Sequence, residues 1–406
     1  MDNLIYWIWL SEKCSPDTPL FSVLYHTFGS AEKIFNADED ELNNVFSLTK
    51  GQVKVLSNKD TQKAENILKE CQMKNIGILT YENKLFPTRL RTIKNPPVLL
   101  YYKGTIPEFD KEVCIGTVGT RTPSSYGCRC AYEIAFDLSL SGAYVISGMA
   151  MGIDSVCHTA ALDAGGKTVA VLGCGVDIIY PKQNEDIYKR LCSNATIISE
   201  YAPGTKATRY SFPQRNRIIS GLSLGTLIVE SQIKSGAMIT AHKTIEQNRD
   251  LFAVPGRLGE YNSTGPNSLI KSGAKAIQSA EDILREYEFL YPEKIKLSGT
   301  KKVKKNNPFD DTNTVIIPQK KAELKTVPDL SITFEDMIEK EDSASFDHLP
   351  EEQKLICESL SKSTPKSLEE IANNTHISVS DIMSSLTILE IQGIVKAVPG
   401  GSFVLV

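Results

Sequence analysis

Between residues 113 and 287, short apolar runs alternate with longer amphipathic stretches, and this alternation constrains the fold more than any other feature. Runs of strand length followed by stretches of helix length predict parallel strands joined by crossover helices. We therefore expect an α/β fold built on a doubly wound parallel sheet. The apolar runs lie at 113–118, 143–146, 168–172, 196–198, 226–229 and 251–254, and the amphipathic stretches lie near 127–141, 153–164, 184–192 and 235–248.

Small and polar residues follow the predicted strands, at the edge where a sheet of this kind binds its ligands. Glycine and serine allow a ligand to approach the backbone closely, and arginine adds a positive charge to the same edge. The candidate residues are Gly119, Thr120 and Arg121 after the first run, Ser147 and Gly148 after the second, and Glu230, Ser235 and Gly236 after the fifth.

The segment 211–222 contains a dense group of candidate phosphate ligands. Phe212 and Pro213 predict an extended approach, after which Arg215 and Arg217 flank Asn216. Two guanidinium groups with an amide between them suit phosphate oxygens. The alternative is that the two arginines form ion pairs with surface acids at the start of a helix.

Ser235 and Gly236 predict a turn that opens a helix reaching about residue 248. The first backbone N–H groups of a helix have no internal partners, so they bind anions well. An ordinary strand-to-helix turn has the same pattern, but the nearby pair of arginines favours phosphate binding. Tyr126 or Phe212 is the aromatic residue that we expect to stack on a base.

Three patterns that imitate known motifs favour structural roles. Residues 165–168 imitate the end of a P-loop but run from helix to strand, the reverse of that motif. Residues 173–175 carry two of the three glycines of a dinucleotide fingerprint, so we do not expect NAD to bind. Ser147, Asp154 and His158 could form a hydrolytic triad. Because Asp154 and His158 are one helical turn apart, we expect a capping aspartate and a packed histidine instead.

The composition gives no sign of a membrane, disulfide-bonded or metal-binding protein. The 406 residues carry a net charge of −4, so a site for a polyanion has to be a local patch. Nine cysteines show no C-x-x-C spacing, which predicts reduced thiols in a cytoplasmic protein with no metal and no cofactor. The apolar run at 4–10 is too short to span a bilayer.

The segments that flank the sheet predict two smaller domains and a linker. We expect an N-terminal helical domain of the SAM or helix-hairpin-helix type with an extended connector at 1–105, the sheet domain at 106–290, and a charged linker at 291–345. Residues 346–406 predict three helices and a hairpin, which form a winged-helix domain. Its third helix, 378–392, contains no lysine or arginine, so we expect this domain to contact protein rather than read duplex DNA.

The glycine, arginine and proline motifs of the sheet domain, taken in order, resemble those of the DNA processing protein A family (DprA, also called Smf). The matching positions are 119–121, 147–148, 152–154, 173–175, 212–217, 235–236, 254–256 and 265–270.

The resemblance implies a non-catalytic, cytoplasmic protein that binds and protects single-stranded DNA. It also implies loading of the RecA recombinase during natural transformation or DNA repair. For the sheet domain it implies an extended Rossmann-like fold and a homodimer formed through that domain. In this chain, Met151 stands where the family commonly has a basic residue, which predicts one phosphate contact fewer. The positions implied to line the phosphate pocket are Arg121, the loop 147–148, Arg215, Arg217 and the turn 235–236.

The alternative prediction is a nucleotide enzyme or a protein that binds and senses a small nucleotide. Gly225 and Thr226, followed by Glu230, resemble the nucleoside-monophosphate phosphoribohydrolases, in which an arginine and a glutamate act on the N-glycosidic bond. Glu230 is then the candidate acid. The Pro-Gly-Gly sequence that usually precedes this Gly-Thr pair is missing, because residues 221–224 stand in its place.

Overall fold

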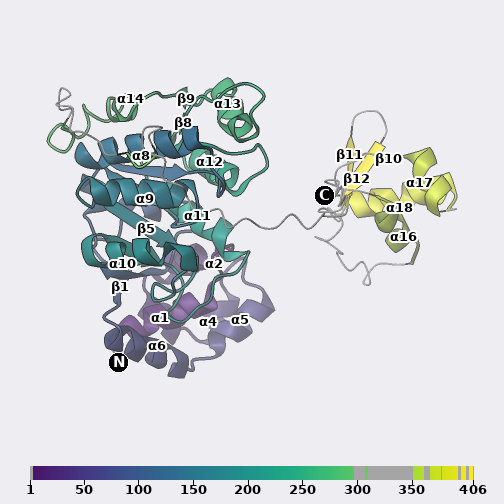
Figure 1. Cartoon of the computed structure of the whole chain (residues 1–406). Helices are drawn as coiled ribbons and strands as arrows, with labels where there is room; N and C mark the ends of the chain where they lie inside the picture. Colours follow the sequence, from purple (N-terminus) through teal and green to yellow (C-terminus); the bar gives the residue numbers. More distant parts are fainter. Residues whose placement is uncertain are drawn as a thin grey trace, which may run out of the picture. The chain divides into compact units, whose positions relative to one another are not determined.

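The computed structural model describes residues 3–296, 307–309, 351–360, 366–375, 377–391, 395–398 and 402–405 (Figure 1). The chain forms two compact units, Met1–Ile317 and Pro318–Val406. Most of the predicted linker, at 297–306 and 310–345, lies outside the described residues.

The described strands of the first unit form one nine-stranded sheet in the order β1-β2-β6-β5-β4-β3-β7-β8-β9. The strands from β3 to β9 pair in parallel, whereas β1 and β2 are antiparallel additions beside β6. The predicted doubly wound sheet is therefore confirmed. The strands are β1 (Gly77–Thr80), β2 (Leu99–Gly104), β3 (Cys114–Val118), β4 (Tyr144–Ser147), β5 (Thr168–Leu172), β6 (Thr196–Ser199), β7 (Gly225–Ile228), β8 (Asp250–Ala253) and β9 (Lys275–Ala276).

Helices cover both faces of this sheet (Figure 1). Successive residues of a strand point to opposite faces, so Ile115 packs with α8, α9 and α14 while Cys114 and Val118 pack with α11 and α12. Each parallel strand is therefore buried on both sides, which explains its nearly continuous apolar sequence. These helices are α8 (Ser125–Leu140), α9 (Ile153–Asp163), α10 (Glu185–Asn194), α11 (Ser211–Leu222), α12 (Gly236–Glu246), α13 (Thr264–Lys271) and α14 (Ala280–Leu284).

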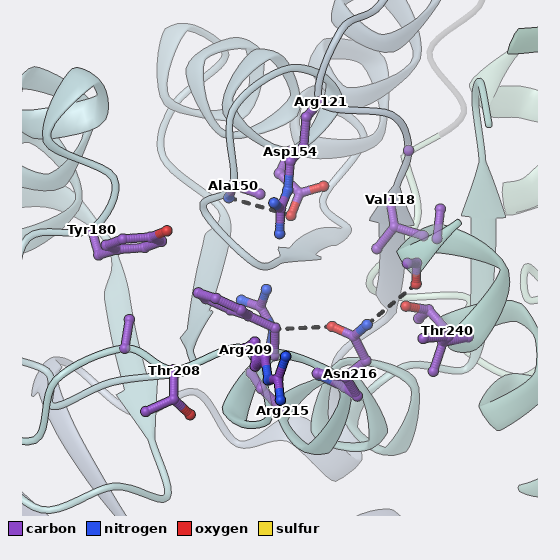
Figure 2. A pocket seen from close by; sticks show the side chains of 17 residues that line it. Val118, Arg121, Ala150, Asp154, Tyr180, Thr208, Arg209, Arg215, Asn216 and Thr240 are labelled. Carbon is purple, nitrogen blue, oxygen red and sulfur yellow. Dashed lines mark hydrogen bonds between the residues drawn. The ribbon is translucent and has the colours of Figure 1, made fainter. Parts of the chain in front are cut away.

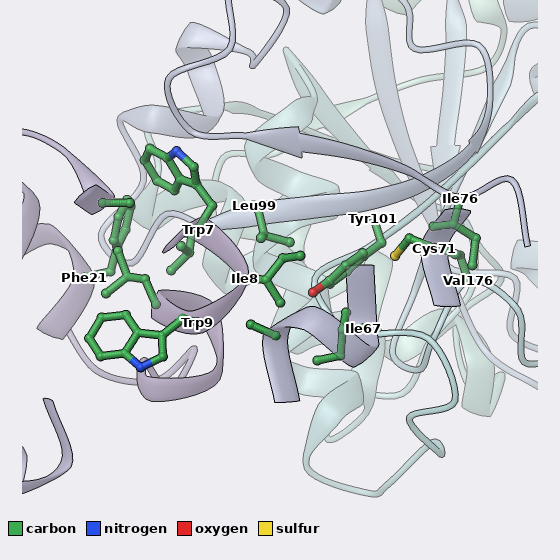
Figure 3. Packing of buried hydrophobic residues seen from close by; sticks show 14 of the residues in the cluster. Trp7, Ile8, Trp9, Phe21, Ile67, Cys71, Ile76, Leu99, Tyr101 and Val176 are labelled. Atoms are coloured by element: carbon green, nitrogen blue, oxygen red, sulfur yellow. The ribbon is translucent and has the colours of Figure 1, made fainter. Parts of the chain in front are cut away.

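The N-terminal helices pack directly onto one end of the sheet. Figure 3 shows Trp7, Ile8 and Trp9 of α1 in the same buried cluster as Leu99 and Tyr101 of β2. The domain boundary that we expected at residue 105 therefore lies just after β2, and β2 is part of the nine-stranded sheet. The helices are α1 (Asn3–Lys13), α2 (Leu20–Phe28), α3 (Ala31–Asn36), α4 (Glu39–Asn43), α5 (Lys50–Ser57), α6 (Gln62–Met73) and α7 (Thr88–Arg91).

The second unit has the expected winged-helix architecture. Ile356, Ile371, Ile382 and Leu386 from its helices form a small core of their own. Residues 399–401, where the predicted hairpin would turn, lie outside the described residues. The helices are α16 (Glu351–Ser359), α17 (Leu368–Thr375) and α18 (Val379–Ile391), and the sheet has the order β10 (Lys366–Ser367), β12 (Ser402–Leu405) and β11 (Val395–Val398).

The predicted extended approach at Phe212 and Pro213 is wrong, because α11 already begins at Ser211. A proline is tolerated in the first turn of a helix, where its missing N–H group would have had no partner. No helix within the described residues has the length and apolar character needed to cross a bilayer.

Candidate nucleic-acid interface

A cavity of about 430 Å³ lies where β3, β4 and β5 end, between the loops that follow them and helices α11 and α12. Figure 2 shows Arg121 and Asp154 on one side of this cavity and Arg209, Arg215 and Asn216 on the other. This position agrees with the expectation that ligands bind beyond the carboxyl ends of parallel strands. The predicted residues that line it are Gly119, Arg121, Phe212, Arg215, Asn216 and Gly236.

Arg215 is fixed at the bottom of the cavity by the ends of two strands. Its side chain comes from α11 and is 95% buried, since only 5% of the residue is exposed. Nη1 donates to the carbonyl oxygens of Gly148, at 2.5 Å, and Val171, and Nε donates to Oδ1 of Asn216 at 3.1 Å. No described residue accepts a hydrogen bond from Nη2, so one corner of the guanidinium is available to an anion.

Gly148 makes this position of Arg215 possible. A Cβ atom at residue 148 would lie 2.3 to 2.5 Å from three guanidinium atoms of Arg215. Burial lowers the pKa of Arg215, while the nearby Asp154 carboxylate acts in the opposite direction. The structure therefore holds a buried, hydrogen-bonded cation whose location depends on a glycine at the end of β4.

Arg121 forms the exposed part of the cavity and lies beside a pair of stacked rings. Its guanidinium carbon is 5.7 Å from the centre of the Phe212 ring. The rings of Phe212 and Tyr180 stack with centroids 5.4 Å apart and an interplanar angle of 30°. Tyr180 remains 45% exposed, so an aromatic surface adjoins the cations.

The N-terminus of α12 forms the remaining wall. Gly236 and Ala237, the first residues of this helix, line the cavity, and Nδ2 of Asn216 donates to the Gly236 carbonyl at 3.4 Å. Ser235 is the residue before the helix and does not itself line the cavity. The first turn of α12 thus places unpaired amide groups and the positive end of the helix dipole beside the arginines.

Arg217 does not belong to this cavity. Residues two apart in an α-helix point about 200° from each other, so Arg215 and Arg217 face different sides of α11. Arg217 is 93% buried and both oxygens of the Glu200 carboxylate accept hydrogen bonds from its Nη2, the shorter at 2.6 Å. The expected meeting of Arg121, Arg215 and Arg217 is therefore corrected, and ion pairing with an acid, the alternative reading, holds for Arg217.

Arg209 supplies the third guanidinium in place of Arg217. It lines the cavity together with Thr208, and its guanidinium carbon is 4.7 Å from the centre of the Tyr210 ring. Sequence reasoning missed Arg209 because it lies at the far end of the loop between β6 and α11, not directly after the strand. The signal that could have revealed it is the basic pair Lys206 and Arg209 just before the helix.

Two further predicted residues support the cavity from behind. Ser147 is fully buried, and its Oγ donates to the Thr117 carbonyl at 2.6 Å. Thr120 acts through its main chain, since its N–H donates to the Glu230 carbonyl at 2.7 Å. At Gly119, a Cβ atom would lie 2.5 Å from the Ile153 side chain, so only glycine allows this close approach of loop and helix.

Asp154 and His158 have structural roles, and the histidine is packed as expected, but the predicted capping role of Asp154 is wrong, because the N-cap of α9 is Gly152 and no side chain caps this helix. Asp154 accepts hydrogen bonds from the backbone N–H groups of Gly148, at 3.1 Å, and Ala150, at 3.4 Å. Burial raises the pKa of Asp154, although Arg215 acts to lower it. His158 is fully buried with Nδ1 2.8 Å from Oγ1 of Thr168, and burial lowers its pKa to about 3. Ser147 Oγ donates to the Thr117 carbonyl and His158 Nδ1 pairs with Thr168, so these two side chains do not form the hydrogen bond that a nucleophile and its base require.

Glu230, the candidate acid of the alternative hydrolase, holds the start of α8 in place. Its carboxylate accepts hydrogen bonds from the backbone N–H of Ser124 at 2.9 Å and from Ser124 Oγ at 2.5 Å. Only 3% of the residue is exposed, and it is not among the residues that line the cavity. Its hydrogen bonds are those of a structural carboxylate.

Comparison with known proteins agrees with this fold. The family described as DNA recombination-mediator protein A matches residues 77–288, and the DprA winged helix domain matches residues 340–401. Protein Smf of Synechocystis is 33% identical over 356 residues, covering 86% of this chain and 84% of that protein. DNA processing protein DprA of Bacillus subtilis is 38% identical over 245 residues, covering 59% of this chain and 82% of that protein.

A solved structure gives the same result. The X-ray structure of DNA processing protein A from Streptococcus pneumoniae superposes with a TM-score of 0.60 at 30% identity. The match covers 70% of this chain and 98% of that one. By the extent of these matches, the chain belongs to the DNA processing protein A (DprA/Smf) family.

Proposed function

We propose that this protein is a recombination mediator that binds single-stranded DNA in the cavity formed by Arg121, Arg209 and Arg215. The observation that carries the proposal is the convergence of three guanidinium groups and a helix N-terminus on one cavity. Guanidinium groups and helix amides are the groups that proteins use to bind phosphate oxygens. Membership of the DprA/Smf family supports DNA as the source of these phosphates.

The aromatic surface favours an unpaired strand over a duplex. A single strand can stack a base on Tyr180 while neighbouring phosphates reach Arg121 and Arg215. In a duplex, the faces of the bases are already stacked and are not available to a protein ring. The stacked pair of Tyr180 and Phe212 beside Arg121 therefore supports preference for single strands.

We further propose that the protein is not an enzyme, that it works in the cytoplasm as a homodimer joined through the sheet unit, and that it delivers the bound strand to RecA. The absence of catalysis is supported by Asp154, His158 and Glu230, whose polar atoms are engaged in hydrogen bonds that hold loops and helices together. The family name, DNA recombination-mediator protein A, supports transfer of the strand to a recombinase.

Fluorescence anisotropy of a labelled oligodeoxythymidine, titrated with the protein at several salt concentrations, tests DNA binding. Removing one phosphate contact from a single strand should reduce the slope of log K against log salt by about 0.7. We expect this reduction for Arg121→Ala and for Arg209→Ala, each with roughly tenfold weaker binding. Arg285→Ala, just after α14, removes an exposed arginine paired with Glu281; it is the matched control and should change neither quantity.

Two results would count against this function. If Arg121→Ala and Arg209→Ala kept the wild-type salt slope, the cavity would not be the DNA site. If an unlabelled duplex competed as well as an unlabelled single strand, the preference drawn from the exposed ring of Tyr180 would be wrong.

A further inference from the structure

A second cavity, of about 670 Å³, lies on the other side of α11 from the DNA cavity, and the proposed function does not use it. It is bounded by the segment 92–95, by Arg217 of α11, by Lys243 and Gln247 at the end of α12, and by Arg249. None of the residues that line the DNA cavity lines this one.

Buried polar atoms without partners gather around this second cavity. Nε and Nη1 of Arg217 and Nε of Arg249 donate to no described residue, and Oδ1 of Asn95 and Oε1 of Gln247 accept from none. Arg217 is 93% buried, so water outside the protein does not compensate these groups. Buried donors and acceptors in native proteins are nearly always paired, and unpaired ones indicate a missing ligand or water. Here five such atoms belong to four residues that line the same space.

The charges around the second cavity favour an anion. Lys94, Arg217, Lys243 and Arg249 line it, whereas Glu246 is the one acid among its lining residues. Glu246 is paired with Lys243 at 2.8 Å. Glu200 pairs with Nη2 of Arg217, so the four cations around the cavity face two carboxylates, Glu246 and Glu200. The remaining positive charge would attract a phosphate group.

The unpaired amide oxygens of Asn95 and Gln247 further restrict the chemical class of the ligand. These atoms are acceptors, so a simple inorganic anion would leave them unsatisfied. A ligand that satisfies the whole set carries an anionic group for the guanidiniums and N–H or O–H donors for the amide oxygens. The volume lies within the range of small-molecule sites. We propose that this cavity binds a free nucleoside monophosphate, with its phosphate toward Arg217 and Arg249 and its sugar or base toward Asn95 and Gln247.

Isothermal titration calorimetry of the full chain with adenosine monophosphate and guanosine monophosphate tests this site. Lys94 and Lys243 carry its charge without making core contacts, so the double variant Lys94→Glu, Lys243→Glu should fold and should bind at least one nucleotide roughly tenfold more weakly than the wild type. Lys69→Glu, a charge reversal on the exposed face of α6, is the matched control and should bind as the wild type does. If the double reversal fails to fold, Lys94→Ala with Lys243→Ala serves in its place.

The comparison with DNA binding separates this proposal from the previous one. Arg121→Ala should leave nucleotide binding unchanged even where it weakens binding of the oligonucleotide. The proposal is overturned if neither nucleotide binds the wild type, or if Arg121→Ala abolishes nucleotide binding and the lysine variants do not. Inorganic phosphate that binds as tightly as the nucleotides would also overturn it, because the amide acceptors would then play no part.

Discussion

At the scale of single residues, the cations of the proposed DNA cavity, Arg121, Arg209 and Arg215, differ in how they are held. Arg215 is buried and fixed by two carbonyl oxygens, whereas Arg121 is exposed beside the ring of Phe212. A fixed cation loses little freedom when a phosphate binds, and an exposed one can follow the backbone of the strand. The cavity thus combines one preorganised contact with contacts that can adjust to different strands.

Met151 stands where the family commonly has a basic residue, so restoring a positive charge there tests whether this chain lacks one phosphate contact. It is 40% exposed in the loop after β4 and lines an adjoining pocket together with Arg121 and Tyr180. Met151→Lys should add one phosphate contact, tighten binding roughly tenfold and raise the salt slope by about 0.7 in the anisotropy titration. Met73→Lys on α6, where the methionine is also exposed, adds the same charge elsewhere. Equal gains from both variants would show that only the net charge matters.

His158 predicts how the stability of the first unit depends on pH. Oγ1 of Thr168 donates to the Val145 carbonyl at 2.8 Å, so it accepts from Nδ1 of His158, and Nε2 has no described partner. Burial lowers the pKa of His158 from 6.5 to about 3, so its contribution to stability is complete above pH 6.5 and is lost as the pH falls towards 3. At pH 5 the loss is about 2 kcal/mol.

His158→Asn should therefore lose less stability between pH 7.5 and pH 5 than the wild type does. Asparagine keeps a donor near Thr168 but cannot be protonated in this range. Thermal unfolding at the two pH values should show a decrease in Tm that is smaller by roughly 4 °C. His242→Gln, at an exposed position on α12, is the control and should follow the wild type. If the two variants show the same dependence on pH, the buried imidazole is not the cause.

At the scale of elements, the DNA cavity depends on the fit between the end of β4 and helix α11. Gly148→Ala removes no charge, but its Cβ would lie 2.3 Å from Nη1 of Arg215 and would force the guanidinium off its two carbonyl partners. We expect roughly tenfold weaker binding of the oligonucleotide and about 1–3 kcal/mol less stability. Gly51→Ala in α5, where the nearest atom is 3.9 Å away, should change neither. Normal DNA binding by Gly148→Ala would mean that Arg215 does not need its present position.

The strands and their ends could be predicted from the sequence, but the direction in which each cationic side chain points could not. Parallel strands buried on both faces produce apolar runs that are easy to recognise, and Gly119, Arg121 and Gly236 follow from the rule for strand ends. An extended segment was expected at Phe212 and Pro213, and in extended backbone residues two apart point to the same side. In the helix that forms instead, Arg215 and Arg217 point about 200° apart, so assigning both to one site was wrong.

At the scale of the whole molecule, the sheet unit and the winged-helix unit differ in the charged side chains that they offer to a ligand. The sheet unit contains every residue of both cavities. The winged-helix unit has its own apolar core, and α18, the helix that usually enters the major groove in such domains, contains no lysine or arginine. Without cations on that helix, contact with phosphates is weak. The second unit is therefore expected to bind a protein partner rather than the strand.

A protein shortened to residues 1–317 tests this division, because that segment forms a compact unit with its own core. It should bind the labelled oligonucleotide within about threefold of the full chain and with the same salt slope, since the phosphate ligands are all retained. Arg121→Ala in the shortened protein should weaken binding as much as it does in the full chain, because mutations in separate units are additive. A tenfold loss of affinity on shortening, with a smaller salt slope, would instead place phosphate contacts in residues 318–406. The cations of the linker and of the second unit would then have to be included in the DNA site.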